Sequence, residues 1–229
     1  MAVNGLSWAN SNPAELPPEE MDCNRQVLDR LCAAGIKVVL VDRDIEAYPQ
    51  RSEFTRIGYD NRRGGTLVTS HLIATGCRRI AFVGIPEVST AVQDRLAGYY
   101  EALRTHGIGA DPELVRETDG PDEEFCRKLV SEARPDGIVC KSDRFAAMLG
   151  RHLMAMGLRI GQDVKLAGFD DDPIATFLPV PLTTVRLPAR PFAEAAFAEV
   201  TTDADQQGSS TQRQIIIDCE LAVRASTAS

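Results

Sequence analysis

Short apolar runs alternate with longer amphipathic stretches along most of this chain, and this alternation constrains the fold more than any other feature. The short runs are residues 38–41, 80–83, 137–140, 164–167 and 215–217. Runs this short and this apolar indicate strands that are covered on both faces. The longer stretches are residues 24–34, 63–75, 90–105, 123–133, 145–156 and 189–201. Strands that alternate with helices predict right-handed crossovers, and therefore an α/β fold with doubly wound, parallel sheets.

Glycine follows four of the amphipathic stretches, at Gly35, Gly76, Gly107 and Gly157. A helix often ends at a residue with positive φ, which glycine adopts without a steric penalty. These glycines therefore predict the ends of helices. Two segments without periodicity are expected to be a surface connection and a loop, and they are residues 11–20 and 206–211.

Length and charge narrow the classes of protein that fit. A chain of 229 residues allows one large domain or two small lobes. Hydrophobic residues make up 44% and charged residues 25%, which is typical of a folded globular protein. The net charge is −8 and the isoelectric point is near 5.0. Because affinity for phosphate backbones comes from clustered Lys and Arg, the general surface is not expected to bind nucleic acid.

Cysteine usage and hydropathy predict a cytoplasmic location. The six cysteines are scattered and none stands at CxxC spacing, so neither a zinc site nor a disulfide framework is expected. No stretch approaches the roughly 20 apolar residues of a membrane helix, so no membrane partner is expected. The first residues have neither a basic nor an apolar region, which argues against a signal peptide.

The usual signatures of catalysis and cofactor binding are not found. The sequence has no phosphate-binding loop and no nucleophile elbow, and Gly107–Gly109 is rejected as a dinucleotide loop because Pro112 takes the place of the third glycine. None of the three histidines has a second His or Cys at ligand spacing, and they are expected at helix surfaces or ends. The triplet at residues 170–172 is interpreted as a strand-end loop. We therefore predict no catalytic residue, metal or cofactor.

Several segments, in order, resemble the effector-binding region of the LacI/GalR family of transcriptional regulators. The segments are GIKVVLVDR at residues 35–43, YDNRRGG at 59–65, HLIATGCRRIAFVG at 71–84, DRLAGY at 94–99, PDGIVCKSDRFA at 135–146, GFDD at 168–171, PLTTV at 181–185 and LAVRAS at 221–226. Two positions depart from the family pattern: Cys77 replaces a histidine, and Ser142 replaces an asparagine.

The resemblance implies two Rossmann-like lobes, as in type I periplasmic binding proteins, with a ligand in the cleft between them. Residues 1–84 plus 186–205 are expected to form the N-terminal lobe, and 85–185 plus 206–229 the C-terminal lobe. The family's helix-turn-helix and the first two βα units are expected upstream of this chain. Asn4-Gly5-Leu6 then resembles the third strand, so the first lobe is predicted to be incomplete.

Five residues are predicted to contact the ligand: Asp42, Arg95, Ser142, Asp143 and Asp170. Both Asp42 and Asp170 end predicted strands, where side chains face the binding edge of such sheets and can accept hydrogen bonds from hydroxyls. Arg95 presents a fork of donors suited to a pair of hydroxyls or a carboxylate.

The remaining two predicted contacts lie at a helix start. Ser142 and Asp143 precede Arg144, where a helix is expected to begin, so each is also a candidate N-cap. Serine at 142 lacks the amide donor that the family uses. Residues 182–185 are expected to be a crossover between the lobes rather than a contact site.

The resemblance implies the ligand-sensing region of a LacI-type repressor that binds a sugar or related polar metabolite. A homodimer is expected, partly because an incomplete first lobe would leave the strand near residues 4–8 with an unpaired edge. Operator DNA would be bound only through a helix-turn-helix that this chain lacks. The alternatives are a periplasmic-type sugar-binding protein, a doubly wound enzyme, and a truncated product without ligand activity.

Overall fold

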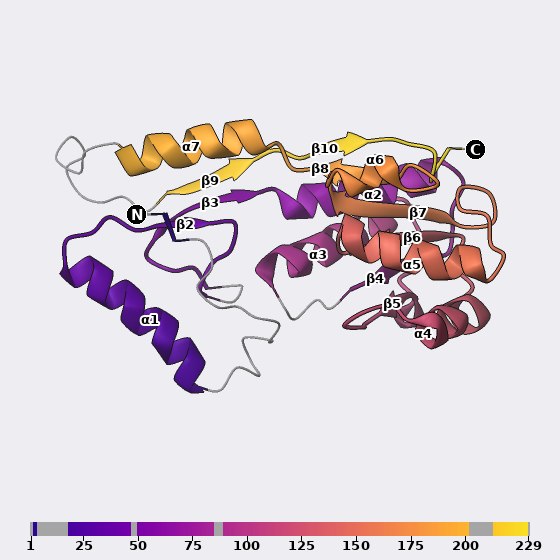
Figure 1. Ribbon diagram of the computed structural model, residues 1–229, viewed down its shortest axis with the longest axis horizontal. Helices are drawn as coiled ribbons and strands as arrows, with labels where there is room; N and C mark the ends of the chain where they lie inside the picture. The colour runs from indigo at the N-terminus through magenta and orange to yellow at the C-terminus, as the bar shows by residue number, and fades with distance from the viewer. Residues whose placement is uncertain (1, 4–17, 47–49, 85–88, 202–212, 229) are drawn as a thin grey trace. The chain divides into compact units, whose positions relative to one another are not determined.

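Two β-sheets, each with its own helices, make up the chain (Figure 1). The computed structural model describes residues 2–3, 18–46, 50–84, 89–201 and 213–228. One unit comprises Met1–Asp60, Glu87–Ala91 and Pro188–Asp218, and the other comprises Asn61–Pro86, Val92–Leu187 and Cys219–Ser229. We call them the first and second units and describe each by itself.

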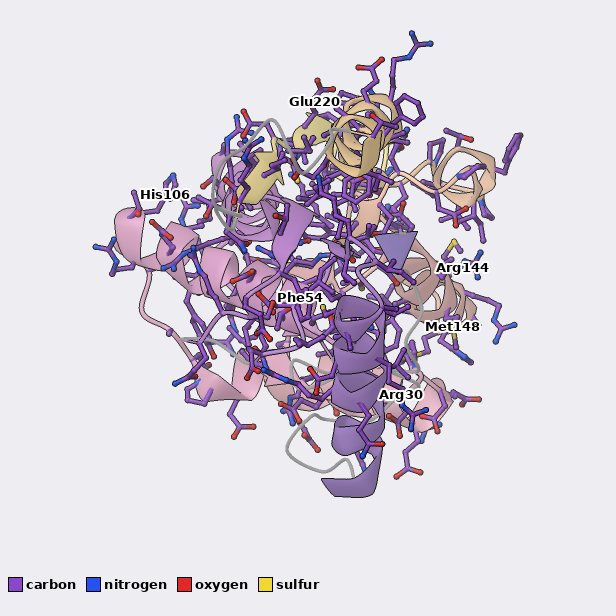
Figure 2. The ribbon with its side chains drawn as sticks, turned by 90° about the vertical axis from the view of Figure 1, so that its left-hand side faces the viewer. Arg30, Phe54, His106, Arg144, Met148 and Glu220 are labelled. Carbon is purple, nitrogen blue, oxygen red and sulfur yellow. The ribbon has the colours of Figure 1, made fainter. Side chains whose placement is uncertain are left out.

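The first unit is built on a four-stranded, all-parallel sheet. Its order is β1 (Ala2–Val3), β2 (Val39–Val41), β3 (Thr55–Tyr59) and β9 (Gln214–Ile217). Helix α1 (Pro18–Ala33) packs through Leu28 against Leu40 and Phe54. Figure 2 labels Phe54. Helix α7 (Ala189–Thr201) lies along β9, and its Phe192 stacks on Tyr59 with ring centroids 4.6 Å apart (Figure 1).

The second unit contains a six-stranded sheet in the order β10-β8-β7-β6-β4-β5. The strands are β4 (Ile80–Val83), β5 (Val115–Arg116), β6 (Gly137–Cys140), β7 (Lys165–Asp170), β8 (Thr183–Arg186) and β10 (Glu220–Ala222). All neighbours are parallel except β10, which runs antiparallel to β8. The central strands are almost completely buried, as the apolar runs predicted.

Helices cover this second sheet. They are α2 (Asn61–Ala74), α3 (Thr90–Thr105), α4 (Glu123–Lys128), α5 (Asp143–Ala155) and α6 (Ile174–Phe177), with short helical turns η2 (Pro112–Leu114) and η3 (Leu129–Ala133). Helix α5 lies over β6 and β7, with Phe145, Leu149 and Leu153 in the core (Figure 1). Its outer side carries Arg144 and Met148, which project away from the ribbon in Figure 2. Helix α2 packs against β6, β8 and β10.

Most of the helices and strands predicted from the sequence are confirmed. The glycines at 35, 76, 107 and 157 all have positive φ, between 69° and 101°, as expected for helix ends. The segment at 182–185, expected to be a crossover, contains most of the buried strand β8, so that expectation is wrong. Strand β3 was missed because its sequence, TRIGY, contains no apolar run.

The division into units differs from the expected one at two boundaries. Residues 61–84 were assigned to the first lobe, but β4 pairs with β6 and therefore belongs to the second sheet. The tail was expected to change lobes near residue 206, but β9 pairs with β3, so the change comes after Asp218. The strand expected near residues 4–8 and the loop at 206–211 lie outside the described residues.

Candidate functional site

The carboxyl ends of the central strands in the second unit bring several polar side chains together. Gly84 follows β4, Lys141 follows β6, and Asp170 ends β7; these three strands are neighbours in the sheet. In open α/β sheets, ligands bind at this edge of the sheet. We call the group formed by Asn61, Arg95, Lys141, Phe169 and Asp170 the edge cluster.

Arg95 is the centre of the edge cluster. Its side chain is only 8% exposed, and its Nε donates to Asn61 Oδ1 at 2.8 Å. One terminal nitrogen donates to the Lys141 carbonyl at 2.6 Å, and the other lies 3.3 Å from Asp170 Oδ1. The guanidinium carbon also lies 4.3 Å from the centroid of the Phe169 ring. Together these contacts fix the guanidinium in one orientation. Among the described residues they engage three of its five N–H groups.

Two adjacent glycines of α2 allow Arg95 to occupy this place. Gly65 lies against the Arg95 carbonyl so closely that a β-carbon there would overlap it. A β-carbon on Gly64 would stand 2.9 Å from the Phe169 ring. The glycine pair in the YDNRRGG segment therefore has a packing role, because it lets α2 approach both α3 and β7. Sequence reasoning singled out this segment without finding that role.

Asp170 and Asp171 turn the chain sharply at the end of β7. Their φ angles are 107° and 56°, a region that side chains other than glycine rarely adopt. Asp171 is held by Arg186 at 2.6 Å and by Arg224 at 2.5 Å. Asp170, whose side chain is 40% exposed, faces Arg95. Strain of this kind is often found at functional sites, and here it directs the two carboxylates to different partners.

Asp143 does not have the position expected of a ligand contact. It is completely buried, its Oδ1 accepts from the Thr184 hydroxyl at 2.6 Å, and its Oδ2 accepts from the Asp172 amide at 2.8 Å. Gly168 provides the space, because a β-carbon there would overlap the carboxylate. Burial raises the pKa of Asp143 to about 7. Both oxygens are therefore engaged within the protein, and we correct its role to that of a structural tie between α5 and β7–β8.

Ser142 is the N-cap of α5. Its hydroxyl oxygen accepts from the Phe145 amide at 3.4 Å, which agrees with the capping role considered from the sequence. Because the hydroxyl still has its own proton to donate, contact with a ligand stays a prediction for this residue.

Asp42, in the first unit, lies at the end of β2 with φ 69°. Arg56 donates to its backbone carbonyl at 3.0 Å and to Gln214 at 2.9 Å. One carboxylate oxygen of Asp42, Oδ1, is buried without a hydrogen-bond partner among the described residues. Buried acceptors are normally satisfied. Contact of this oxygen with a ligand stays a prediction.

Within the described ranges, no three His, Cys, Asp or Glu side chains are arranged to hold a metal ion. None of the helices in those ranges combines the length and apolar character needed to cross a membrane.

Comparison with known families decides the classification. Residues 69–227 match the periplasmic binding protein-like domain. The chain belongs to this family. Its relatives include the regulator MalR of Streptomyces coelicolor, 30% identical over 214 residues, and GalR of Escherichia coli, 33% identical over 156 residues. These alignments cover 89% and 66% of this chain, and 60% and 44% of the relatives. The chain thus spans about half the length of the curated relatives it matches.

Solved structures agree with this classification. The complex of the regulator CelR with cellobiose is 26% identical to this chain, with a TM-score of 0.75, over 92% of this chain and 71% of CelR. A LacI-family regulator of Enterococcus faecium with bound ribose, 20% identical, has a TM-score of 0.74 over 94% of this chain and 77% of its own. The predicted fold and the resemblance to LacI/GalR regulators are confirmed, and the relatives named here are regulators rather than enzymes.

Proposed function

We propose that this chain is the ligand-sensing region of a LacI-type transcriptional regulator and that it binds a small polyhydroxylated effector. The observation that carries the proposal is the buried, fixed guanidinium of Arg95 at the carboxyl edge of the second sheet. Such a group, with free N–H donors beside a carboxylate, suits adjacent hydroxyls of a sugar. The ligands of two related structures, cellobiose and ribose, support this class of effector.

The predicted contacts supply both donors and acceptors. Arg95 would donate to ligand oxygens, while Asp170 and the buried Oδ1 of Asp42 would accept from hydroxyls. Ser142 would donate through its hydroxyl. Asp143 is not part of this proposal. The interlobe cleft expected from the sequence stays a prediction.

The wider biology is proposed by analogy with the relatives. We propose a cytoplasmic homodimer that acts as a repressor, with operator DNA bound through a helix-turn-helix that the chain does not contain. The regulators among the relatives favour this function over a periplasmic sugar-binding protein or an enzyme. The acidic chain itself is expected to show no salt-dependent binding to duplex DNA.

Calorimetric titration of the chain with a panel of mono- and disaccharides tests the proposal. We expect at least one saturable ligand. Because a lost charge-assisted hydrogen bond costs about 1.5–3 kcal/mol, Arg95→Gln should weaken that ligand roughly 10- to 150-fold. Arg104→Gln, on the exposed end of the same helix, is the matched control and should leave binding unchanged. Full affinity in a folded Arg95→Gln variant, or no ligand in the panel, would overturn the proposal.

A further inference from the structure

Lys141 occupies an unusual position in the edge cluster. It lies between the end of β6 and Ser142, the N-cap of α5. Its aliphatic stem passes over Gly84, where a β-carbon would come within 2.8 Å of the Lys141 β-carbon. Its Nζ lies 4.6 Å from the centroid of the Phe145 ring. Glycine on one side and an aromatic ring on the other therefore define where the ammonium group sits.

Within the part of the chain that the structure describes, no carboxylate is in ion-pair contact with the ammonium of Lys141. The arginines around the same edge of the sheet are all paired: Arg95 with Asp170, Arg144 with Asp172, and Arg186 and Arg224 with Asp171. Among the described residues, Lys141 Nζ makes a cation–π contact with the ring of Phe145. Of the cations described at this edge, Lys141 is thus one whose charge has no direct counter-ion among the described residues.

Partial burial makes this arrangement costly. Desolvation lowers the pKa of Lys141, while the negative charge of Asp119 acts weakly in the opposite direction. Removal from water without a counter-ion destabilises the charged form of a lysine. Groups with pKa values perturbed in this way are concentrated at binding and catalytic sites. An incoming anion would offset this cost.

The charges of the edge cluster also favour a single anionic group. Arg95 and Asp170 carry opposite charges 3.3 Å apart, so Lys141 leaves the cluster with an excess of one positive charge. The two cations are linked, because Arg95 donates to the Lys141 backbone carbonyl. The start of α5, a helix of 13 residues, adds the positive end of its dipole beside Lys141.

We propose that Lys141, together with Arg95, binds a carboxylate or phosphate group of the effector, so that this chain prefers an acidic sugar derivative to a neutral sugar. The inference rests on the proposed function and names the chemical class of its ligand. Arg95 would supply its two remaining N–H donors in a planar fork, and Lys141 would supply a point charge. Asp170 would stay available to a hydroxyl of the same molecule.

Matched ligands test this inference by calorimetry on the whole chain. We would titrate glucose, glucuronate and glucose 6-phosphate, and the corresponding galactose series. We expect an acidic member of a series to bind at least tenfold more tightly than its neutral parent, and increasingly so at low salt. Tighter binding of the uronate would identify a carboxylate, and tighter binding of the phosphate ester would identify a phosphate; either result supports the inference.

Variants separate this inference from the proposed function. Lys141→Gln should weaken binding of the acidic member about tenfold more than binding of its neutral parent, and so abolish the preference between them. Lys128→Gln, at an exposed lysine of α4, is the control and should retain the preference. Equal or tighter binding of the neutral sugar, or a preference that survives in Lys141→Gln, would overturn the inference and leave the proposed function standing. No binding of any compound would overturn both.

Discussion

Gly98 of α3 lies directly against the backbone carbonyl of Arg62 in α2, so that a β-carbon at position 98 would overlap that oxygen. The same β-carbon would stand 2.8 Å from the Thr66 amide nitrogen. The Thr66 hydroxyl donates to the Arg62 carbonyl at 3.1 Å and lies 3.2 Å from the Gly98 carbonyl. With Gly65 packed against the Arg95 backbone, each helix contributes a glycine to one close crossing. This crossing sets the position from which Arg95 reaches Asn61.

Gly98→Ala should therefore separate α2 from α3. Overpacking of a close contact usually costs about 1–3 kcal/mol, and here the clash is with backbone, which cannot rotate away. We expect the free energy of unfolding to fall by an amount in this range, measured by urea denaturation.

A second glycine provides the control for this variant. Gly109→Ala adds the same methyl group at a position with no heavy atom within 4 Å of the new β-carbon. We expect that variant to unfold like the parent protein. If Gly98→Ala and Gly109→Ala had the same stability, the close crossing would not constrain the fold.

Ser226 joins β7 to β8 through a completely buried hydroxyl. Its Oγ donates to the Leu166 carbonyl at 2.6 Å and accepts from the Thr183 amide at 2.8 Å. Ser226→Ala leaves both groups without a partner, and a buried unsatisfied polar group costs about 1–3 kcal/mol. We expect a loss of this size in urea denaturation. Ser131→Ala, at an exposed helical position, should change stability by less than about 0.5 kcal/mol.

The buried cysteines should resist alkylation in the native protein. Burial raises the pKa of the Cys126 thiol to about 11, and it raises that of the completely buried Cys140 further. The thiolate is the reactive form of cysteine. Iodoacetamide at pH 8 should therefore modify exposed Cys32 and leave Cys126 and Cys140 unmodified until the protein unfolds. Peptide mass spectrometry measures the extent at each site. Rapid modification of Cys140 under native conditions would contradict the described core.

The strands that are apolar throughout could be predicted from the sequence. Strands with buried polar residues that form hydrogen bonds inside the protein could not. Strand β8 contains Thr183 and Thr184, both completely buried. The hydroxyl of Thr183 lies 2.7 Å from that of Thr227, and the hydroxyl of Thr184 donates to Asp143. These partners lie more than 40 residues away, so a local pattern cannot reveal that the threonines are inside.

The candidate site was predictable to the extent that it depends on strand ends. Arg95 and Asp170 were predicted as contacts because strand ends and helix starts converge at this edge. A terminal guanidinium nitrogen of Arg95 indeed lies 3.3 Å from Asp170 Oδ1. Asp143 was misjudged because sequence position at a helix start does not tell which way a carboxylate faces. Lys141 was missed because its surroundings, with the Phe145 ring and no ion-paired carboxylate among the described residues, come from the packing of distant segments.

The last prediction concerns the pH dependence of folding. Asp143 has a pKa of about 7 in the folded protein, because burial penalises its charged form, against about 3.9 in an unfolded chain. Between these values the folded state keeps a proton that the unfolded state has lost. The contribution of Asp143 to stability is therefore fully present below about pH 4 and is lost as the pH rises to about 7. Linkage puts this loss at about 2–4 kcal/mol.

Asp143→Asn removes this titration while it keeps an oxygen for the Thr184 hydroxyl. We expect the variant to lose less stability than the parent protein between pH 4.5 and 7.5, measured by urea denaturation at several pH values. Subtracting the two curves cancels other groups, including His71, whose pKa is lowered by burial and whose effect has the opposite sign. Asp163→Asn is the control. Arg159 lowers the pKa of that exposed carboxyl to about 2, so the substitution should change the pH dependence of stability only at pH values below about 4. Parallel curves for Asp143→Asn and the parent above pH 4.5 would show that Asp143 is ionised in the folded protein throughout this range.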